Sequence, residues 1–152
     1  MLFTVPPGAT GFTAPHDEPL PVTGLRAFRA ALHAAARAAG GSVVGPESPA
    51  YPLAFHTAAV TTRAGESILL CHAHLPWIAF VRERLWGYED EFLAPPEWAG
   101  AFVGAGFEVL GREQLVVPLA EVDTSGLTEF ERSRIRYHGT GTLGGVLFNA
   151  WD

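Results

Sequence analysis

The sequence contains no lysine, and its charged fraction of 17% is low for a globular protein. All ten basic residues are therefore arginine, against sixteen acidic residues, and the formal net charge is −6. Because a nucleic-acid-binding protein gains most of its affinity by neutralising phosphates, an acidic chain without lysine argues against nucleic acid as a partner. No basic cluster indicates binding to an anionic membrane surface.

Cysteine and long apolar runs are also scarce. The single cysteine, Cys71, cannot form an intrachain disulfide, and no apolar run approaches the ~20 residues of a membrane-spanning helix. No arginine precedes position 26, and prolines interrupt the region where a signal peptide would be apolar. We therefore expect a cytoplasmic location and no membrane partner.

What the chain does contain is enough apolar sequence for a core. Its 152 residues, 48% of them hydrophobic, can bury a core without disulfides. Residues 1–22 are rich in proline and glycine and predict an extended arm packed on the domain. Residues 23–152 predict a single α+β domain, in which an antiparallel sheet of about four or five strands is covered by two or three helices.

Apolar residues at helical spacing predict a helix over residues 25–39. Thr23 is in position to cap its start, and Gly40-Gly41 is in position to end it. Later in the chain, residues 107–119 predict a strand, a turn and a second strand. Residues 127–138 fit either a helix or a strand. Thr142 is in position to cap a last helix.

Two strand-like runs around Arg63-Ala64-Gly65 predict a β-hairpin. A three-residue loop would set Thr62 opposite Glu66 and, counting back, His56 opposite His72. His74 follows His72 at the spacing that shares one face of a strand. Three imidazoles on one patch are typical of a catalytic zinc or iron site, so a His-based metalloenzyme is one candidate function, with the metal ligands His56, His72 and His74.

The pattern from Gly65 to Glu83 faintly resembles the first cupin motif, whose histidines and glutamate bind a metal. The gap from His74 to Glu83 is longer than in that family, and no second motif follows. The opposing interpretation is that these histidines are hydrogen-bonded within the sheet, because a register shift of one residue would move His56 to the other face. Cys71 alternates with His72 along the strand and is expected to be a small core residue.

An acidic, aromatic stretch follows the hairpin. Exposed aromatic side chains can anchor a protein partner, and acids can steer a basic one toward them. This stretch predicts a partner-binding surface for a basic protein such as a toxin, formed by Trp86, Tyr88, Glu89, Asp90, Glu91 and Trp98. An ordinary acidic loop with inward-facing aromatics is the alternative, and a pocket for a small apolar ligand lined by Trp77, Trp86 and Trp98 is a third candidate.

The C-terminal stretch IRYHGTGTLGGVLFNAWD contains G-x-G-x-x-G, but too little chain follows it for a dinucleotide-binding unit. The stretch resembles the ending of small uncharacterised bacterial proteins, some of which are thought to be immunity proteins against secreted toxins. This chain has His138 and Gly139 where other residues are expected in that ending. The residues that carry the resemblance are Arg136, Tyr137, Thr142, Gly144, Phe148, Asn149, Trp151 and Asp152.

In that ending, Asn149 and an Arg136–Asp152 pair are expected to tie down the terminus. The resemblance, the acidic charge and the lack of a convincing catalytic motif together predict a non-enzymatic, cytoplasmic bacterial interaction protein without a cofactor. An immunity protein that covers a basic toxin surface is the most concrete version. Zinc or iron is expected only under the metalloenzyme alternative.

Overall fold

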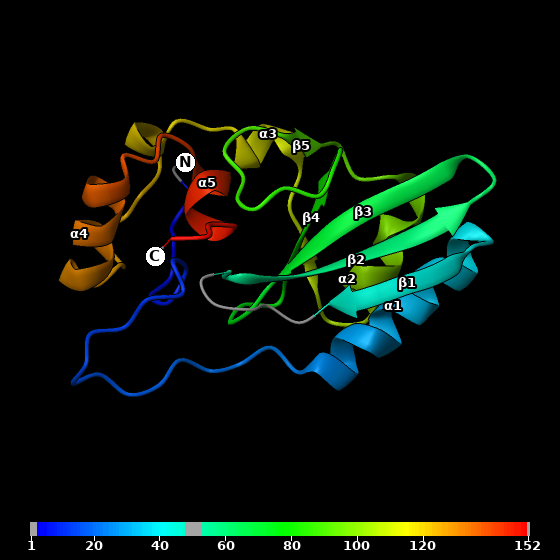
Figure 1. Ribbon diagram of the computed structural model, residues 1–152, viewed down its shortest axis with the longest axis horizontal. Helices are drawn as coiled ribbons and strands as arrows, with labels where there is room; N and C mark the ends of the chain where they lie inside the picture. Colours follow the sequence, from blue (N-terminus) through cyan, green and yellow to red (C-terminus); the bar gives the residue numbers. More distant parts are fainter. Residues whose placement is uncertain (1–2, 48–52, 152) are drawn as a thin grey trace.

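The computed structural model describes residues 3–47 and 53–151. Figure 1 shows a twisted sheet at one end of the molecule and a group of short helices at the other. In chain order the elements are α1 (Leu25–Ala39), β1 (Ser42–Glu47), β2 (Phe55–Thr62), β3 (Gly65–His72), β4 (Trp77–Val81), β5 (Phe92–Leu93), the 3₁₀ helix η1 (Glu97–Ala99), α2 (Gly100–Gly104), β6 (Glu108–Val109), α3 (Arg112–Leu115), the 3₁₀ helix η2 (Leu119–Glu121), α4 (Glu129–His138) and α5 (Leu143–Leu147).

The α+β architecture is confirmed. The strand order is β1-β2-β3-β4-β5, with antiparallel neighbours throughout, and the short β6 pairs with β4. Because the pairing of β6 with β4 is parallel, the sheet is mixed rather than purely antiparallel.

Helix α1 has the predicted bounds because its apolar spacing agrees with a clear stop signal. Phe28 and Leu32 are buried against the sheet. Gly40 adopts a left-handed conformation with φ 69° and ends the helix. Its start differs from the prediction, since Gly24 occupies the N-cap and the Thr23 hydroxyl instead lies within hydrogen-bond distance of the carbonyl oxygens of His72, at the end of β3, and Leu75, just after it.

The hairpin register is one residue away from the predicted one. The connecting loop contains only Arg63-Ala64, so Thr62 lies opposite Gly65. His72 therefore pairs with Phe55 rather than with His56. Since neighbouring residues of a strand face opposite sides, this shift moves His56 to the other face of the sheet.

The region after β6 is helical where a strand was predicted. The Gln114 side chain accepts a hydrogen bond from the Gly111 N–H at 3.0 Å and stabilises the start of α3, while Leu115 is fully buried. Residues 127–138 contain helix α4. The Thr128 hydroxyl caps it by accepting from the Glu131 N–H at 3.1 Å.

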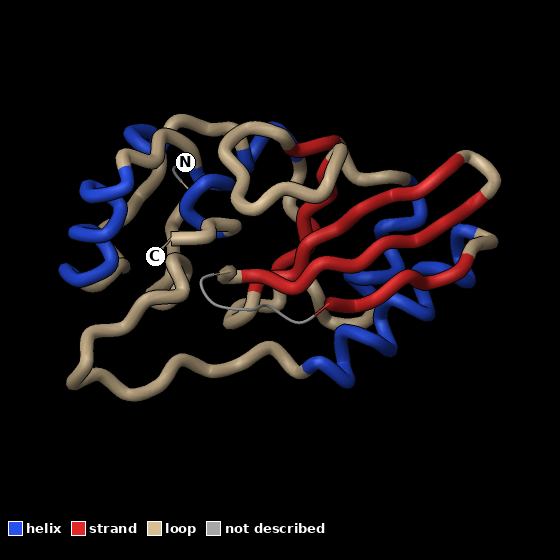
Figure 2. The backbone as a smooth tube through the Cα atoms, in the orientation of Figure 1, coloured by secondary structure: helices blue, strands red, loops and turns tan. Residues whose placement is uncertain are grey.

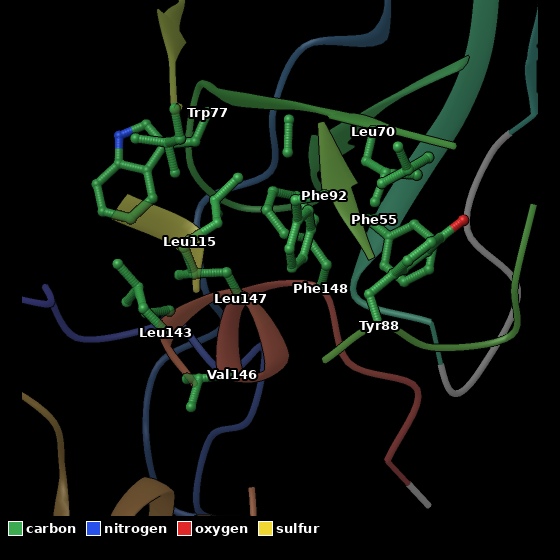
Figure 3. Close-up of a cluster of buried hydrophobic side chains, with 14 of the residues drawn as sticks. Phe55, Leu70, Trp77, Tyr88, Phe92, Leu115, Leu143, Val146, Leu147 and Phe148 are labelled. Atoms are coloured by element: carbon green, nitrogen blue, oxygen red, sulfur yellow. The ribbon is translucent and has the colours of Figure 1, made fainter. Parts of the chain in front are cut away.

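Buried side chains form two clusters on opposite sides of the sheet. One lies between the sheet and α1 with α2, and includes Phe28, Leu69 and Phe102. The other gathers aromatic and aliphatic side chains from the sheet, α3 and α5 around one point (Figure 3). Its labelled members are Phe55, Leu70, Trp77, Tyr88, Phe92, Leu115, Leu143, Val146, Leu147 and Phe148.

The described part of the N-terminal arm runs as a loop from beside α4 and α5 to the start of α1 (Figure 2). Its Val5 and Ala9 are fully buried in the second cluster. Thr4 forms an isolated parallel bridge with Asp123. The arm thus joins the two ends of the molecule.

Candidate functional site

Two glycines let the C-terminal segment pack closely on the acidic, aromatic stretch. A Cβ atom on Gly144 would overlap the ring of Phe92, and one on Gly145 would overlap the carboxylate of Glu89. The Thr142 hydroxyl caps α5 by accepting from the Gly145 N–H at 3.0 Å, as predicted. The GTGTLG motif therefore serves a tight turn and close packing.

Glu89 joins the two segments through its side chain and its backbone. Its Oε1 accepts a hydrogen bond from the Gly141 N–H at 2.8 Å, and its carbonyl oxygen accepts from the Thr142 hydroxyl at 2.5 Å. Residues more than fifty positions apart thereby form one continuous surface.

A hollow of about 340 Å³ lies between these segments, and we call it the acidic hollow. Trp86 is 63% exposed, which is unusual for a tryptophan. Trp151 stacks parallel on His138, with ring centroids 4.8 Å apart. The lining residues are Trp86, Gly87, Tyr88, Glu89, Glu91, His138, Gly139, Thr140, Gly145, Asn149, Ala150 and Trp151.

The hollow carries negative charge. Glu91 Oε2 accepts hydrogen bonds from the N–H groups of Glu89 and Asp90 at 2.9 and 2.8 Å. Burial alone would raise the pKa of Glu91, but backbone N–H groups around it hold that pKa below its ordinary value. Glu91 is therefore ionised at neutral pH.

The predicted binding residues do not all share this surface. Trp86, Tyr88, Glu89 and Glu91 line the hollow, although Tyr88 is only 5% exposed. The Tyr88 hydroxyl donates to the Glu83 carbonyl and accepts from the Leu85 N–H, and burial raises its pKa. Tyr88 is thus mainly a core residue.

Asp90 and Trp98 lie outside the lining of the hollow. Asp90 is exposed and directly follows Glu89 in the chain. Trp98 packs edge-on against Phe80, with ring centroids 5.6 Å apart. Trp77 is buried against Phe3 in the second cluster, whereas Trp98 packs against the cluster on the α1 side of the sheet, so the described residues do not bring the three predicted tryptophans to one pocket.

The predicted convergence of His56, His72 and His74 on a metal is wrong. Strand β3 ends at His72, so His74 lies in a bend rather than at the next position on the same face. His56 points to the α1 side, with its ring 5.9 Å from that of Phe28. Within residues 3–47 and 53–151, no group of three or more histidine, cysteine or acidic side chains could hold a metal.

Cys71 lies opposite His56 in the hairpin and is fully buried. Burial raises the pKa of its thiol to about 12, which keeps the thiol protonated. Both ring nitrogens of His56 are buried without a hydrogen-bond partner, and burial, followed by the nearby His74, lowers its pKa. This pair therefore provides neither a thiolate nor an aligned base.

His72 has a structural role instead. Its Nε2 donates to the Ala9 carbonyl at 2.8 Å, and its Nδ1 accepts from the N–H groups of His74 and Leu75 at 3.0 and 3.1 Å. These bonds require the neutral ring, and burial lowers the pKa of His72 to about 4. The ring connects the N-terminal arm to the end of β3.

Two buried polar residues of structural importance were missed or only partly predicted. Glu131 has no exposed surface, and its carboxylate accepts from the N–H groups of Gly8 and Thr10 and from the Thr10 hydroxyl. The sequence signal at Glu131, a Thr-x-x-Glu capping box, predicts only a helix start. The Asn149 amide donates to the carbonyls of Thr10 and Val146 at 2.8 and 2.7 Å.

Arg136 pairs with Glu129 at 2.9 Å. The expected partner, Asp152, lies outside the described residues.

No helix of the described chain is both long and apolar enough to cross a membrane. No protein family, curated protein or solved structure matches this chain. What the protein does must therefore be inferred from its own geometry.

Proposed function

We propose that the protein is a non-enzymatic interaction module whose acidic hollow receives a basic side chain of a protein partner. An immunity protein that covers a basic toxin in the bacterial cytoplasm is the most concrete version. The observation that carries the proposal is the exposed Trp86 beside the carboxylates of Glu89 and Glu91, at one hollow.

The chemistry of this hollow suits a cation. A lysine or arginine side chain is attracted to the face of a tryptophan ring and forms charge-assisted hydrogen bonds with carboxylates. Glu89 and Glu91 supply carboxylates, and Trp86 supplies an accessible aromatic ring. Because tryptophan is enriched among the residues that dominate binding energy, Trp86 is the expected anchor.

Charge outside the hollow supports a basic partner. Between Glu83 and Glu131 the chain has eleven acidic residues, all but Glu131 at least partly exposed, and two basic ones, Arg84 and Arg112. A surface of one sign accelerates association with a partner of the opposite sign, and salt weakens this effect.

Affinity capture from cells of the source bacterium, with matched variants as bait, tests this proposal. Trp86→Ala should reduce capture of a basic partner at least tenfold, and Asp90→Asn should reduce it several-fold, mainly at low salt. The control variants are Val103→Ala, at another exposed apolar side chain, and Glu113→Gln, at another exposed acid. Glu89 is left unchanged because its carboxylate also holds the Gly141 N–H.

Capture of one basic protein that depends on Trp86 and Asp90, but not on Val103 and Glu113, would support the proposal. Equal capture by the Trp86→Ala and Val103→Ala baits would contradict it. Capture of an acidic partner only would also contradict it.

A further inference from the structure

A second hollow lies against α4, outside the acidic hollow. Its volume is about 290 Å³, and we call it the α4 hollow. Its walls come from η2, the loop that follows η2, and one face of α4. The lining residues are Leu119, Ala120, Thr124, Arg132, Ile135 and Arg136.

The α4 hollow combines an apolar wall with two guanidinium groups. Leu119, Ala120 and Ile135 provide aliphatic surface, and Ile135 belongs to the main buried cluster. Arg132 and Arg136 are four positions apart on α4, which places both on the same side of the helix. An arginine can hold a carboxylate through two parallel hydrogen bonds.

The two arginines share one counter-ion. Glu129 Oε2 lies 3.2 Å from Arg132, and Glu129 Oε1 lies 2.9 Å from Arg136. Two guanidinium groups against one paired carboxylate leave an excess of positive charge at this pair of arginines. Two further acids lie in the adjoining chain: Glu121, the exposed last residue of η2, and Asp123, which accepts hydrogen bonds from Ser125 and Thr4.

Glu129, which is not among the residues lining the α4 hollow, is held only weakly by the two arginines. Its side chain is 71% exposed, and exposed ion pairs of this kind contribute little to stability. The hydrogen bonds from Arg136, and then from Arg132, lower the pKa of Glu129, as a positive site would. An external carboxylate can therefore replace Glu129 at modest cost.

We propose that the α4 hollow binds a small aliphatic monocarboxylate. Its carboxylate takes the place of Glu129 between Arg132 and Arg136, and its chain lies on Leu119, Ala120 and Ile135. A volume of about 290 Å³ lies at the lower end of the range for small-molecule pockets, so a ligand of short chain length fits. This inference does not depend on the proposed function of the acidic hollow.

Titration of the intact chain with butanoate, hexanoate and octanoate, followed by NMR chemical shifts, tests the apolar part of the site. Each added methylene that becomes buried should tighten binding about fourfold, until the hollow is filled. Hexanamide, a neutral molecule of nearly the same shape, should bind at least tenfold more weakly than hexanoate. N-acetyl-leucine extends the series, and tighter binding than hexanoate would identify a peptide C-terminus as the natural source of the carboxylate.

Two variants should change hexanoate affinity in opposite directions. Arg136→Gln should weaken hexanoate binding about tenfold, because one of the two guanidinium groups that would hold the carboxylate is lost. Glu129→Gln should strengthen it several-fold, because the competing carboxylate is removed. Arg112→Gln, at an exposed arginine on α3, is the matched control and should leave affinity unchanged.

Opposite shifts in Arg136→Gln and Glu129→Gln would support the site. Absence of saturable hexanoate binding to the unmodified chain at millimolar concentration would overturn the proposal, as would equal binding of hexanamide. Both of these measurements use the natural sequence, so they decide the matter even if a variant fails to fold. A weaker affinity in Glu129→Gln would also overturn it.

Discussion

The two ends of the molecule are held together in different ways. Around α1, apolar faces of a regular helix and sheet meet, and the one buried imidazole there, His56, has no hydrogen-bond partner. Around α4 and α5, much of the chain is loop, and buried polar side chains bind its backbone. Glu131, Asn149 and His72 all do so toward residues 8–10 of the arm.

This difference predicts how each end responds to substitution. An apolar face spreads its stabilising effect over many contacts, whereas a buried carboxylate concentrates several hydrogen bonds in one group. Removal of such a group leaves its donors buried without partners. The α4 and α5 end should therefore depend on a few individual polar residues, and both hollows lie at that end.

The largest effect is expected for Glu131→Ala. Loss of the carboxylate leaves the Gly8 N–H, the Thr10 N–H and the Thr10 hydroxyl without their acceptor, at a cost of about 4 kcal/mol in the free energy of unfolding. Urea denaturation measures this change. The exposed control, Glu113→Ala, should change stability by less than about 0.5 kcal/mol. A loss below about 1 kcal/mol in Glu131→Ala would remove the contrast between the two ends.

The next effect is a loss of stability in acid. The pKa of His72 falls from 6.5 to about 4 on folding, so between these values the unfolded chain binds a proton that the folded chain excludes. Stability should therefore fall as pH decreases from about 6.5 to about 4, by about 3 kcal/mol. His56, whose pKa is also lowered, adds to this loss.

Thermal or urea unfolding at several pH values measures the acid effect. His33→Gln, at an exposed position of α1, is the matched control, because its side chain takes no part in the three hydrogen bonds of His72. His72→Gln should be less stable at neutral pH but should lose less stability on acidification. A natural chain that is equally stable at pH 7 and pH 4.5 would refute the assignment of His72 as a buried neutral ring.

The smallest effect should have the opposite sign. Because both ring nitrogens of His56 are buried without partners, His56→Leu should stabilise the fold by about 1 kcal/mol at neutral pH. His72→Leu, on the opposite face of the same hairpin, should destabilise it, since three hydrogen bonds are lost. Equal destabilisation by both variants would show that the two faces do not differ in this way.

Sequence patterns predicted the structure best where the contacts that determine it are local. The bounds of α1 are correct because a period of 3.6 residues and a terminal glycine act within a few positions of each other. The hairpin was located, but its register was wrong, because loops of two and three residues both accommodate Gly65. That register shift of one residue places His56 and His72 on opposite faces of the sheet.

Only part of the candidate site was predicted, because sequence patterns indicate local contacts and not those between distant segments. Exposed Trp86 and the acids next to it were found from composition, but the burial of Tyr88 was not. The other wall of the acidic hollow comes from residues 138–151, about fifty positions later in the chain. The Asn149 contact with Thr10 spans 139 positions, and no local pattern indicates such a contact.

The hydrogen bonds between Glu131 and Thr10 also limit how early the N-terminal arm can pack during synthesis. These residues are 121 positions apart, which a ribosome adding about 5–20 residues per second takes roughly 6–24 s to translate. Throughout that interval the arm lacks its buried anchor, whereas α1 and both strands of the hairpin are complete by His72, well before Glu131 is made. The buried positions of Val5 and Ala9 next to this anchor are therefore expected to form only after Glu131 has been made.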